Sequence, residues 1–439
     1  MRRLQILILI LGACACPAMA ENWPAWRGTS GDGVSHEKDL PTAWNKSNGI
    51  TWTALIPEWG DSTPAIWRNA IFVTSNVGDK LLLLKLDKRT GTIAWTREIG
   101  ASEATRMPLR KKEGPERSEQ KFHQLHNMAT PSPVTDGEVV VAHFGNGDLA
   151  AYDFSGKQLW KHNLQVDHGK YTIWWGHANS PVIVGNLVIS ICMQDSLADL
   201  QPNAPIPSYL VAHDLHTGKE RWKTMRMTKA TAEECDAYTT PLIVEIAGKQ
   251  QLVVMGGNQL DGYDPATGMQ LWYLPGLVGG RTVTGPIVAD DYLFATRGMR
   301  GATFALELED IAQARSKELD FHSIAWKYDQ GTPDSCSPVA WGDWLFTVAD
   351  DGIARCFDLR TGHLKWKERL KGKFKASPIA ADGRIYFLSM DGVCTVVAAS
   401  DRFERVSENE IDDTFLASPA VSDGHIYLRG RVKLYCIGK

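Results

Sequence analysis

Hydrophobic residues between positions 335 and 370 come in four short runs, separated by turns rich in Gly and Asp. Pro338 opens the first run, and the other three cover residues 344–348, 353–359 and 364–366. Apolar runs of this length, bounded by such turn residues, are typical of β-strands joined by tight turns. The segment is therefore predicted to form one unit of four strands.

The turn before the last strand of this unit has the form Asp-x-x-Thr-Gly-x-x-x-Trp, and the chain repeats it. Four copies without gaps begin at Asp87, Asp214, Asp264 and Asp358. The Asp and Thr oxygens can accept hydrogen bonds from nearby backbone N–H groups, and Gly can take the positive φ of a tight turn. The Trp on the following strand can act as a wedge between neighbouring units.

Each unit opens with a proline that follows Ser, Thr or Gly, and these openings count the units. There are eight of them: Pro64, Pro133, Pro181, Pro241, Pro286, Pro338, Pro378 and Pro419. A repeat of roughly 40–50 residues with four strands per unit is typical of a radial propeller. We therefore predict an all-β fold, an eight-bladed β-propeller of four-stranded blades.

The outer-strand Trp marks the blades and indicates how the ring closes. In the first six blades it is Trp95, Trp160, Trp222, Trp272, Trp326 and Trp366. The eighth blade begins at Leu416 and has only three strands, whereas residues 50–55, with Trp52, resemble an isolated outer strand. We predict that this N-terminal strand joins the C-terminal blade. A closed ring leaves no long unpaired edge, so a monomer is expected.

The repeated hairpin, the proline openings and the eightfold count resemble the pyrroloquinoline-quinone-like β-propeller repeat family, over nearly all of the mature chain. Residues 22–33 are similar to the N-terminal segment of secreted bacterial propellers. The family includes quinoprotein alcohol dehydrogenases and the non-enzymatic lipoprotein of the outer-membrane barrel-assembly machinery. The resemblance therefore implies a fold but does not choose between a catalytic and a binding function.

The first 20 residues have the pattern of an export signal. Arg2 and Arg3 precede an apolar stretch over residues 4–13, and Ala-Met-Ala at 18–20 is a typical cleavage site. A second interpretation is a lipobox that would leave Cys14 as a lipidated N-terminus. We expect an exported protein, periplasmic or associated with the cell envelope.

Beyond the signal, the chain divides into two parts. Residues 21–49, rich in Gly, Pro and Trp, are predicted to form an irregular strap, and residues 50–439 a single propeller domain. No other apolar run is long enough to span a bilayer. Three stretches depart from the repeat, at 100–127, 194–208 and 307–320. The last replaces the Thr-Gly hairpin of blade five and is predicted to contain a short helix.

Charge and cysteine content narrow the range of functions. Without the signal the chain has 45 basic and 51 acidic residues, a net charge of −6, which argues against binding to bulk nucleic acid. Six cysteines remain, scattered and without Cys-x-x-Cys spacing. We expect them to be small buried residues rather than disulfides or metal ligands.

Candidate binding residues come from the loops that open the blades. In a propeller these loops converge at one mouth of the central channel, so polar residues at equivalent positions can form a binding site there. The candidates are His126, Asn127, His177, Asn179, Asp236, Arg281, Arg300 and Asp334. Arg281 and Arg300 belong to one blade and are expected to lie side by side, solvated, which suits a carboxylate or phosphate. The alternative is that these residues are polar only because turns are exposed to solvent.

The sequence contains no strong sign of catalysis. There is no Gly-x-Ser-x-Gly elbow, no Cys-x-x-Cys-His, and no adjacent cysteine pair, which the quinoprotein pattern includes. We therefore expect a non-catalytic binding or scaffold protein that acts through its funnel mouth on a protein or a small anionic ligand, with envelope protein assembly as one role. No cofactor or metal is expected. The alternative is an enzyme similar to quinoprotein dehydrogenases, with pyrroloquinoline quinone and calcium in the funnel.

Overall fold

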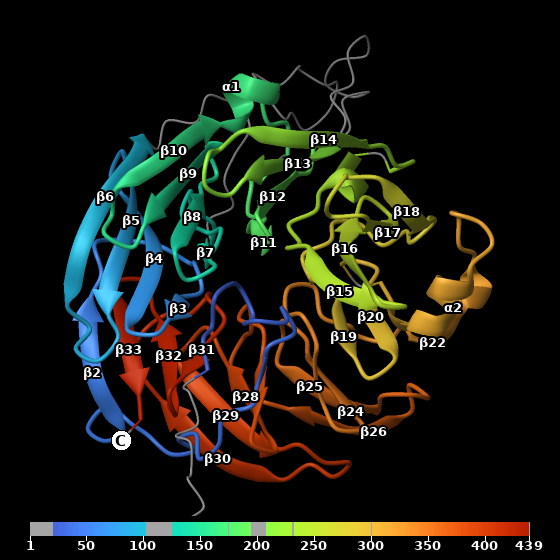
Figure 1. Ribbon diagram of the computed structural model, residues 1–439. Helices are drawn as coiled ribbons and strands as arrows, with labels where there is room; N and C mark the ends of the chain where they lie inside the picture. The colour runs from blue at the N-terminus through green and yellow to red at the C-terminus, as the bar shows by residue number, and fades with distance from the viewer. Residues whose placement is uncertain are drawn as a thin grey trace, which may run out of the picture.

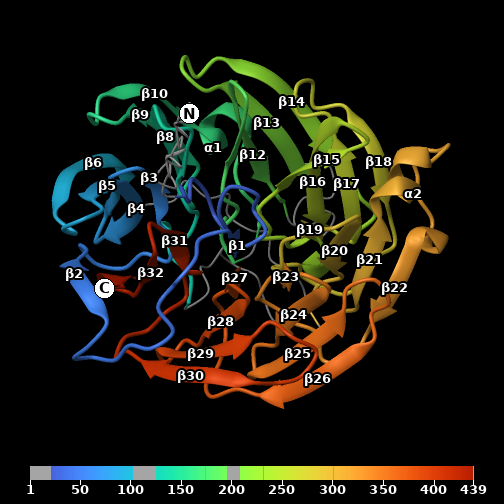
Figure 2. The ribbon, with the colours of Figure 1, turned by 60° about the horizontal axis from the view of Figure 1, so that its bottom comes forward.

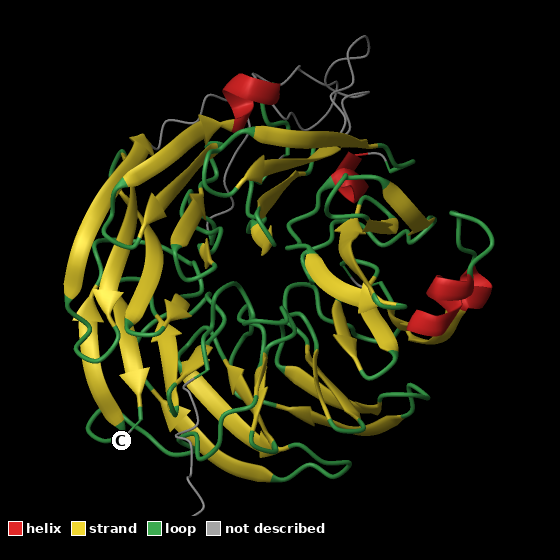
Figure 3. Cartoon of the chain, viewed as in Figure 1, coloured by secondary structure: helices red, strands yellow, loops and turns green. Residues whose placement is uncertain are grey.

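The computed structural model describes residues 21–101, 125–173, 175–194, 208–230, 232–299 and 301–438. Within these residues, eight blades stand in a ring around a central channel, and the four strands of each blade form an antiparallel sheet (Figure 1). The predicted eight-bladed propeller is confirmed. Strands make up most of the regular structure, with a few short helices (Figure 3). The signal segment with Cys14, most of the first two predicted insertions, and Arg300 lie outside the described residues.

The first four blades follow the chain, each from the inner to the outer strand. Blade 1 consists of β3 (Ala65–Trp67), β4 (Ala70–Val77), β5 (Lys80–Asp87) and β6 (Ile93–Ala101). Blade 2 consists of β7 (Val134–Thr135), β8 (Val139–His143), β9 (Asp148–Asp153) and β10 (Gln158–Asn163), followed by helix α1 (Leu164–His168). Blade 3 consists of β11 (Val182–Val184), β12 (Leu187–Cys192), β13 (Ser208–Asp214) and β14 (Glu220–Arg226). A 3-10 turn (Ala232–Cys235) precedes blade 4, which consists of β15 (Leu242–Ile246), β16 (Lys249–Gly256), β17 (Gln259–Tyr263) and β18 (Gln270–Leu274).

The other four blades complete the ring. Blade 5 consists of β19 (Ile287–Ala289), β20 (Tyr292–Thr296), β21 (Thr303–Glu307) and β22 (Ile324–Tyr328), with α2 (Leu308–Gln313) and a 3-10 turn (Phe321–Ser323) before its last strand. Blade 6 consists of β23 (Val339–Trp341), β24 (Trp344–Val348), β25 (Ile353–Asp358) and β26 (Leu364–Arg369). Blade 7 consists of β27 (Ile379–Ala381), β28 (Arg384–Leu388), β29 (Val393–Ala398) and β30 (Arg405–Glu410). Blade 8 consists of β31 (Ala420–Ser422), β32 (His425–Arg429), β33 (Lys433–Ile437) and the N-terminal strand β2 (Ile50–Leu55).

Strand β2 closes the ring as predicted. It pairs antiparallel with β33, with Trp52 opposite Cys436 and Leu55 opposite Lys433. The indole Nε1 of Trp52 then reaches blade 1 and donates to the carbonyl oxygen of Lys88 at 3.0 Å. The N-terminal strand therefore completes the sheet of blade 8 and adds a contact between blade 8 and blade 1.

The strap before β2 crosses the centre of the ring (Figure 2). Trp23 forms a bridge with Ile66 at the inner strand of blade 1, and β1 (Val34–Ser35) pairs in parallel with β27 of blade 7. Between them, Arg27 is only 1% exposed and its guanidinium donates to the carbonyl oxygen of Pro338 at 2.6 Å. The same guanidinium also donates to the carbonyl oxygen of Ser337 at 3.4 Å, so Arg27 connects the strap to blade 6.

The repeated hairpin is explained by contacts between neighbouring blades. In six blades the outer-strand Trp donates its indole N–H to a main-chain carbonyl in the next blade. The pairs are Trp52–Lys88 at 3.0 Å, Trp95–Phe154 at 3.1 Å, Trp160–Leu215 at 2.8 Å, Trp222–Pro265 at 3.1 Å, Trp326–Leu359 at 2.9 Å and Trp366–Ser400 at 3.0 Å. The indole also lies over the hairpin Gly: a Cβ on Gly362, at φ +69°, would come within 2.5 Å of Trp326. Glycine is needed there both for its φ and for the space.

Trp272 of blade 4 departs from this arrangement. Its Nε1 donates to Oε1 of Gln251 in its own blade, at 2.8 Å. Blade 5 has no Thr-Gly hairpin to receive it, because residues after β21 form α2 instead, as the sequence predicted. The seam between blades 4 and 5 is therefore built differently from the other seams described above.

Six cysteines lie in the described residues; none of them forms a disulfide there, and all but Cys235 are buried. None of the helices in this part of the chain has the length and apolar character needed to cross a bilayer.

Candidate functional site

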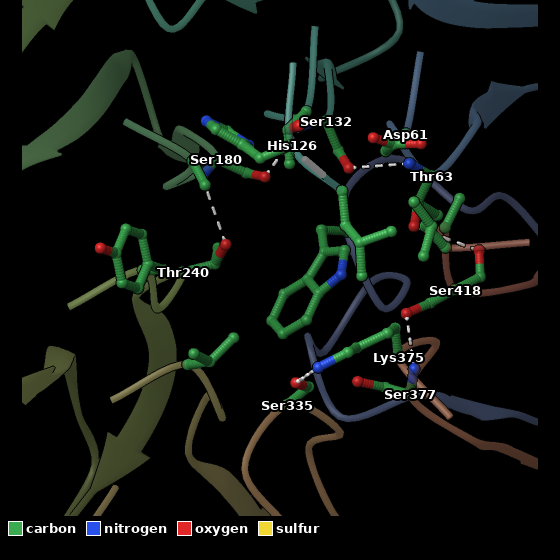
Figure 4. A pocket seen from close by; sticks show the side chains of 18 of the residues that line it. Asp61, Thr63, His126, Ser132, Ser180, Thr240, Ser335, Lys375, Ser377 and Ser418 are labelled. Carbon is green, nitrogen blue, oxygen red and sulfur yellow. Dashed lines mark hydrogen bonds between the residues drawn. The ribbon is translucent and has the colours of Figure 1, made fainter. Parts of the chain in front are cut away.

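A cavity of about 430 Å³ lies on the propeller axis (Figure 4). All eight loops that open the blades contribute to its wall, and Trp26 of the strap contributes as well. The lining residues are Trp26, Asp61, Thr63, Leu125, His126, Thr130, Ser132, Trp175, Ala178, Ser180, Tyr238, Thr240, Arg281, Val283, Asp334, Ser335, Lys375, Ser377, Leu416, Ala417 and Ser418. Its size and its mixture of aromatic and polar groups are typical of a ligand site.

A ring of hydrogen bonds between hydroxyls and main-chain groups surrounds this cavity. In six of the eight blades, the residue before the opening proline donates its N–H to the hydroxyl of its counterpart in the next blade. The bonds are Thr63 to Ser132 (2.9 Å), Ser132 to Ser180 (2.9 Å), Ser180 to Thr240 (3.3 Å), Gly285 to Ser337 (2.8 Å), Ser337 to Ser377 (2.9 Å) and Ser377 to Ser418 (3.0 Å). Thr63 closes the circle by donating its Oγ1 to the carbonyl oxygen of Ser418 at 3.1 Å. The inner rim is therefore held rigidly, which suits a preformed site.

Gly285 interrupts the ring of hydroxyls. It stands where the other blades have Ser or Thr, and so offers no hydroxyl to Thr240. A Cβ at Gly285 would lie 3.1 Å from the Trp26 ring. The small residue at blade 5 thus makes room for the indole that the strap brings to the axis. The sequence contained this signal, since Gly285 is the one non-hydroxyl residue before the eight prolines, but nothing in it indicated that Trp26 fills the space.

Two ion pairs stand side by side on the wall from blades 5 to 7. Arg281 pairs with Asp334 and Lys375 pairs with Asp350, each at 2.6 Å. Lys375 also donates to Oγ of Ser335 at 2.9 Å. Arg281 and Lys375 are 28% and 32% exposed, so both remain accessible from the cavity. The sequence predicted a solvated Arg281; the structure pairs it with Asp334 instead.

Asp61 lies on the other side of the cavity, in blade 1 (Figure 4). It accepts hydrogen bonds from Nε1 of Trp59 at 3.2 Å and from Nδ2 of Asn127 at 2.6 Å. Burial raises the pKa of Asp61 to about 7, although the Trp59 hydrogen bond and the charges of Arg429 and Arg431 act to lower it. The charge of the cavity therefore changes near neutral pH.

The structure separates the predicted site residues into two groups. His126, Arg281 and Asp334 line the cavity. Asn127, His177, Asn179 and Asp236 are buried behind the wall, at most 6% exposed. Among these, His177 packs on His143 with ring centres 4.3 Å apart, and Nδ2 of Asn179 donates to the carbonyl oxygen of Thr239 at 2.6 Å. Arg300 lies outside the described residues.

The cavity holds a serine between a lysine and a carboxylate, but the arrangement does not activate it. Oγ of Ser335 donates to Oδ2 of Asp350 at 2.8 Å, and the same carboxylate pairs with Lys375. Lys375 donates to Oγ of Ser335 as well as to Asp350, so it acts here as a hydrogen-bond donor to the serine and not as the acceptor of its proton.

The donor groups at the cavity also do not fit calcium with a quinone. Calcium takes six to eight oxygen ligands, usually with several carboxylates together. The cavity carboxylates Asp61 and Asp334 belong to blades 1 and 6 and are bonded to Asn127 and Arg281. In the described part of the chain, the one group of three metal-ligating side chains is His168, His213 and Glu220, which do not line the cavity.

Comparison with known families agrees with the fold and the repeat. The family model described as outer membrane protein assembly factor BamB matches residues 33–202 and 322–407, more than half of the chain. The chain belongs to this family. The unmatched stretch between, residues 203–321, contains all of blade 4 and most of blade 5. No curated protein sequence matches this chain.

Solved structures with the same fold include proteins of different function. BamB from Moraxella catarrhalis is 14% identical, with a TM-score of 0.59 over 89% of this chain and 99% of that one. The quinohemoprotein alcohol dehydrogenase from Comamonas testosteroni is 12% identical, with a TM-score of 0.65 over 94% of this chain and 80% of that one. The computationally designed Ika8 protein is 11% identical, with a TM-score of 0.57 over 89% and 100%. At these identities the likeness concerns the fold alone.

Proposed function

We propose that this protein is a non-catalytic binding protein of the cell envelope, which holds an acidic segment of a partner protein in its axial cavity. The observation that carries the proposal is the convergence of all eight blade-opening loops and Trp26 on one cavity with two accessible cations. The family description, which names outer membrane protein assembly, supports a role in assembling envelope proteins.

The chemistry of the wall favours a peptide that carries a carboxylate. Arg281 and Lys375 are already paired with Asp334 and Asp350, so a partner carboxylate would exchange with these internal ones rather than enter an uncompensated positive site. A guanidinium can bind a carboxylate through two parallel hydrogen bonds. Trp26 and Trp175 offer aromatic surface for an apolar side chain of the same segment. A small inorganic anion would use the cations but leave this surface uncovered.

The test compares two double variants that lose the same charge. A partner is captured from envelope extract and identified, and a synthetic peptide of its acidic segment is titrated by calorimetry. Replacing Arg281 and Lys375 with Gln should weaken binding at least tenfold, about 1.4 kcal/mol or more. Replacing Arg360 and Lys371, which are 59% and 58% exposed and do not line the cavity, should leave the affinity within twofold. A folded cavity variant with the parental affinity would refute the proposal.

Binding should also depend on pH through Asp61. Its pKa of about 7 means that raising the pH from 6 to 8 adds a negative charge to the cavity. We therefore expect an acidic peptide to bind more weakly at pH 8 than at pH 6. Asp61→Asn should remove most of this difference, and an unchanged pH profile in that variant would show that Asp61 does not face the bound segment.

The proposal includes no cofactor. Protein purified from its native host should show no quinone absorbance and no calcium at one ion per chain in elemental analysis. A stoichiometric quinone would favour the dehydrogenase alternative instead.

A further inference from the structure

Blade 3 departs from the repeat at two positions of its hairpin. The residue before the hairpin Asp is Leu86, Tyr263 or Phe357 in the other gap-free copies, but His213 in blade 3. The residue two places after the hairpin Gly is Ile93, Gln270 or Leu364 in those copies, but Glu220 in blade 3. Both changes replace apolar or neutral side chains with groups that can ligate a metal.

These two residues meet a third from the neighbouring blade. Helix α1 follows the outer strand of blade 2 and ends at His168. His168, His213 and Glu220 each offer a ligand atom, and these atoms all lie within 4.8 Å of one another. Nε2 of His168 is 3.5 Å from Oε2 of Glu220. Ligands in a tetrahedral zinc site, each about 2.0–2.1 Å from the ion, are about 3.4 Å apart.

Each of the two imidazoles has one ring nitrogen that is buried without a hydrogen-bond partner. His213 is 1% exposed, and its Nδ1 is buried without a partner. Nε2 of His168 is likewise buried without a hydrogen bond. Buried polar atoms are nearly always satisfied, so two such nitrogens beside a carboxylate point to a missing ligand. Glu220 is 45% exposed and leaves the group open to solvent on one side.

The surroundings keep the two imidazoles available. The side chains packed on them are rings: Trp160 and His162 lie against His213, and Tyr209 lies edge-on to His168. His162 does not compete, because its two ring nitrogens bond Asp167 at 3.1 Å and the carbonyl oxygen of Gly218 at 2.7 Å.

We propose that His168, His213 and Glu220 bind one divalent transition-metal ion of the zinc class, with water in the fourth position. A site of two imidazoles and one carboxylate favours zinc over calcium or magnesium, which bind mainly oxygen ligands. The ion would link the end of α1 in blade 2 to β13 and β14 of blade 3, across the seam that Trp160 also bridges. This site is separate from the axial cavity, so it stands or falls independently of the proposed function.

The repeat supplies a variant that should remove a ligand without disturbing the fold. Trp160 stacks on His213 with ring centres 6.1 Å apart and an angle of 27°. In the sister seam Trp326 stacks on Phe357 at 6.3 Å and 28°. His213→Phe therefore places in blade 3 the side chain that the same position already holds in blade 6, and the variant should keep its packing.

The experiment titrates Zn²⁺ into tag-free protein that has been depleted of metal with a chelator. The parent should bind one ion per chain, and His168→Gln, His213→Phe and Glu220→Gln should each weaken zinc binding at least tenfold. His216→Gln, in the same hairpin and exposed, should bind as the parent does. Zinc should raise the melting temperature of the parent and of the His216 variant but not of His213→Phe, because an ion that binds only the folded state stabilises it.

Two results would overturn the proposal. One is a parent protein that binds no stoichiometric zinc. The other is folded His213→Phe and His168→Gln variants that keep the parental affinity, since zinc would then be held by other surface groups.

Discussion

Neighbouring blades are joined differently at two seams of the ring, the one between blades 5 and 6 and the one between blades 4 and 5. In the first, Trp326 donates to the carbonyl oxygen of Leu359 and lies over Gly362, while Gly285 donates its N–H to Ser337. In the second, Trp272 turns back to Gln251 in its own blade. The outer-strand Trp crosses to the next blade at the first seam and stays within its own blade at the second.

Main-chain hydrogen bonds take the place of the crossing Trp at the seam between blades 4 and 5. The main-chain N–H of Tyr273 donates to the carbonyl oxygen of Lys317 at 2.7 Å, and its carbonyl oxygen accepts from the N–H of Leu319 at 2.8 Å. These bonds join β18 to the segment after α2. Near the axis, the main-chain N–H of Tyr238 donates to the carbonyl oxygen of Thr282 at 2.8 Å. Replacing the hairpin with α2 thus removes one kind of link and supplies another. This seam also lies within the stretch that the family model does not match.

The largest expected effect tests the wedge at the regular seam. Gly362→Ala adds a Cβ within 2.5 Å of Trp326 at φ +69°, whereas Gly342→Ala in the same blade adds one at φ +56° into open space. The first should cost about 2–4 kcal/mol of unfolding free energy, from overpacking added to backbone strain, and the second about 1 kcal/mol. Urea denaturation measures both. Equal costs would mean that the Trp does not require the glycine.

A smaller loss of stability is expected when the side chain that accepts the Trp hydrogen bond is removed, because Trp272 bonds a side chain whereas Trp366 bonds a main-chain carbonyl. Gln251→Ala removes the partner of a buried indole N–H and should cost about 1–3 kcal/mol. Ser400→Ala leaves the main-chain carbonyl that accepts from Trp366 in place, and should change stability by no more than about 0.5 kcal/mol. If the two substitutions cost the same, the Trp272 hydrogen bond is not part of what holds blade 4 together.

The smallest effect concerns the gap in the hydroxyl ring. Gly285→Ser restores a hydroxyl but places its Cβ 3.1 Å from Trp26, so a loss of about 1 kcal/mol is expected. In a Trp26→Ala background the same change should be neutral or stabilising. A double-mutant cycle measures this coupling, and additive effects would separate Gly285 from the position of the strap.

The sequence by itself determined the ring. Each blade is a local unit whose strands are joined by short turns, so Pro, Thr-Gly and Trp at fixed offsets reveal it without knowledge of the rest of the chain. The closing strand could be predicted because Trp52 carries the same signal outside its blade, and the pairing of β2 with β33 confirms it. The helix in blade 5 could be predicted because residues 307–320 lack the turn signals that every regular hairpin contains.

Only the tertiary structure decided which side chains meet. Loops at equivalent positions all approach the axis, but packing turns His126 and Arg281 to the cavity and buries His177 and Asn179 behind it. No local pattern places Trp26 against Gly285 or pairs Arg281 with Asp334, because these contacts join segments far apart in the chain. The same holds for His168 and His213, which come from different blades. Turn chemistry is local and can be deduced from neighbouring residues, whereas a site is made by side-chain directions that the packing of the whole ring fixes.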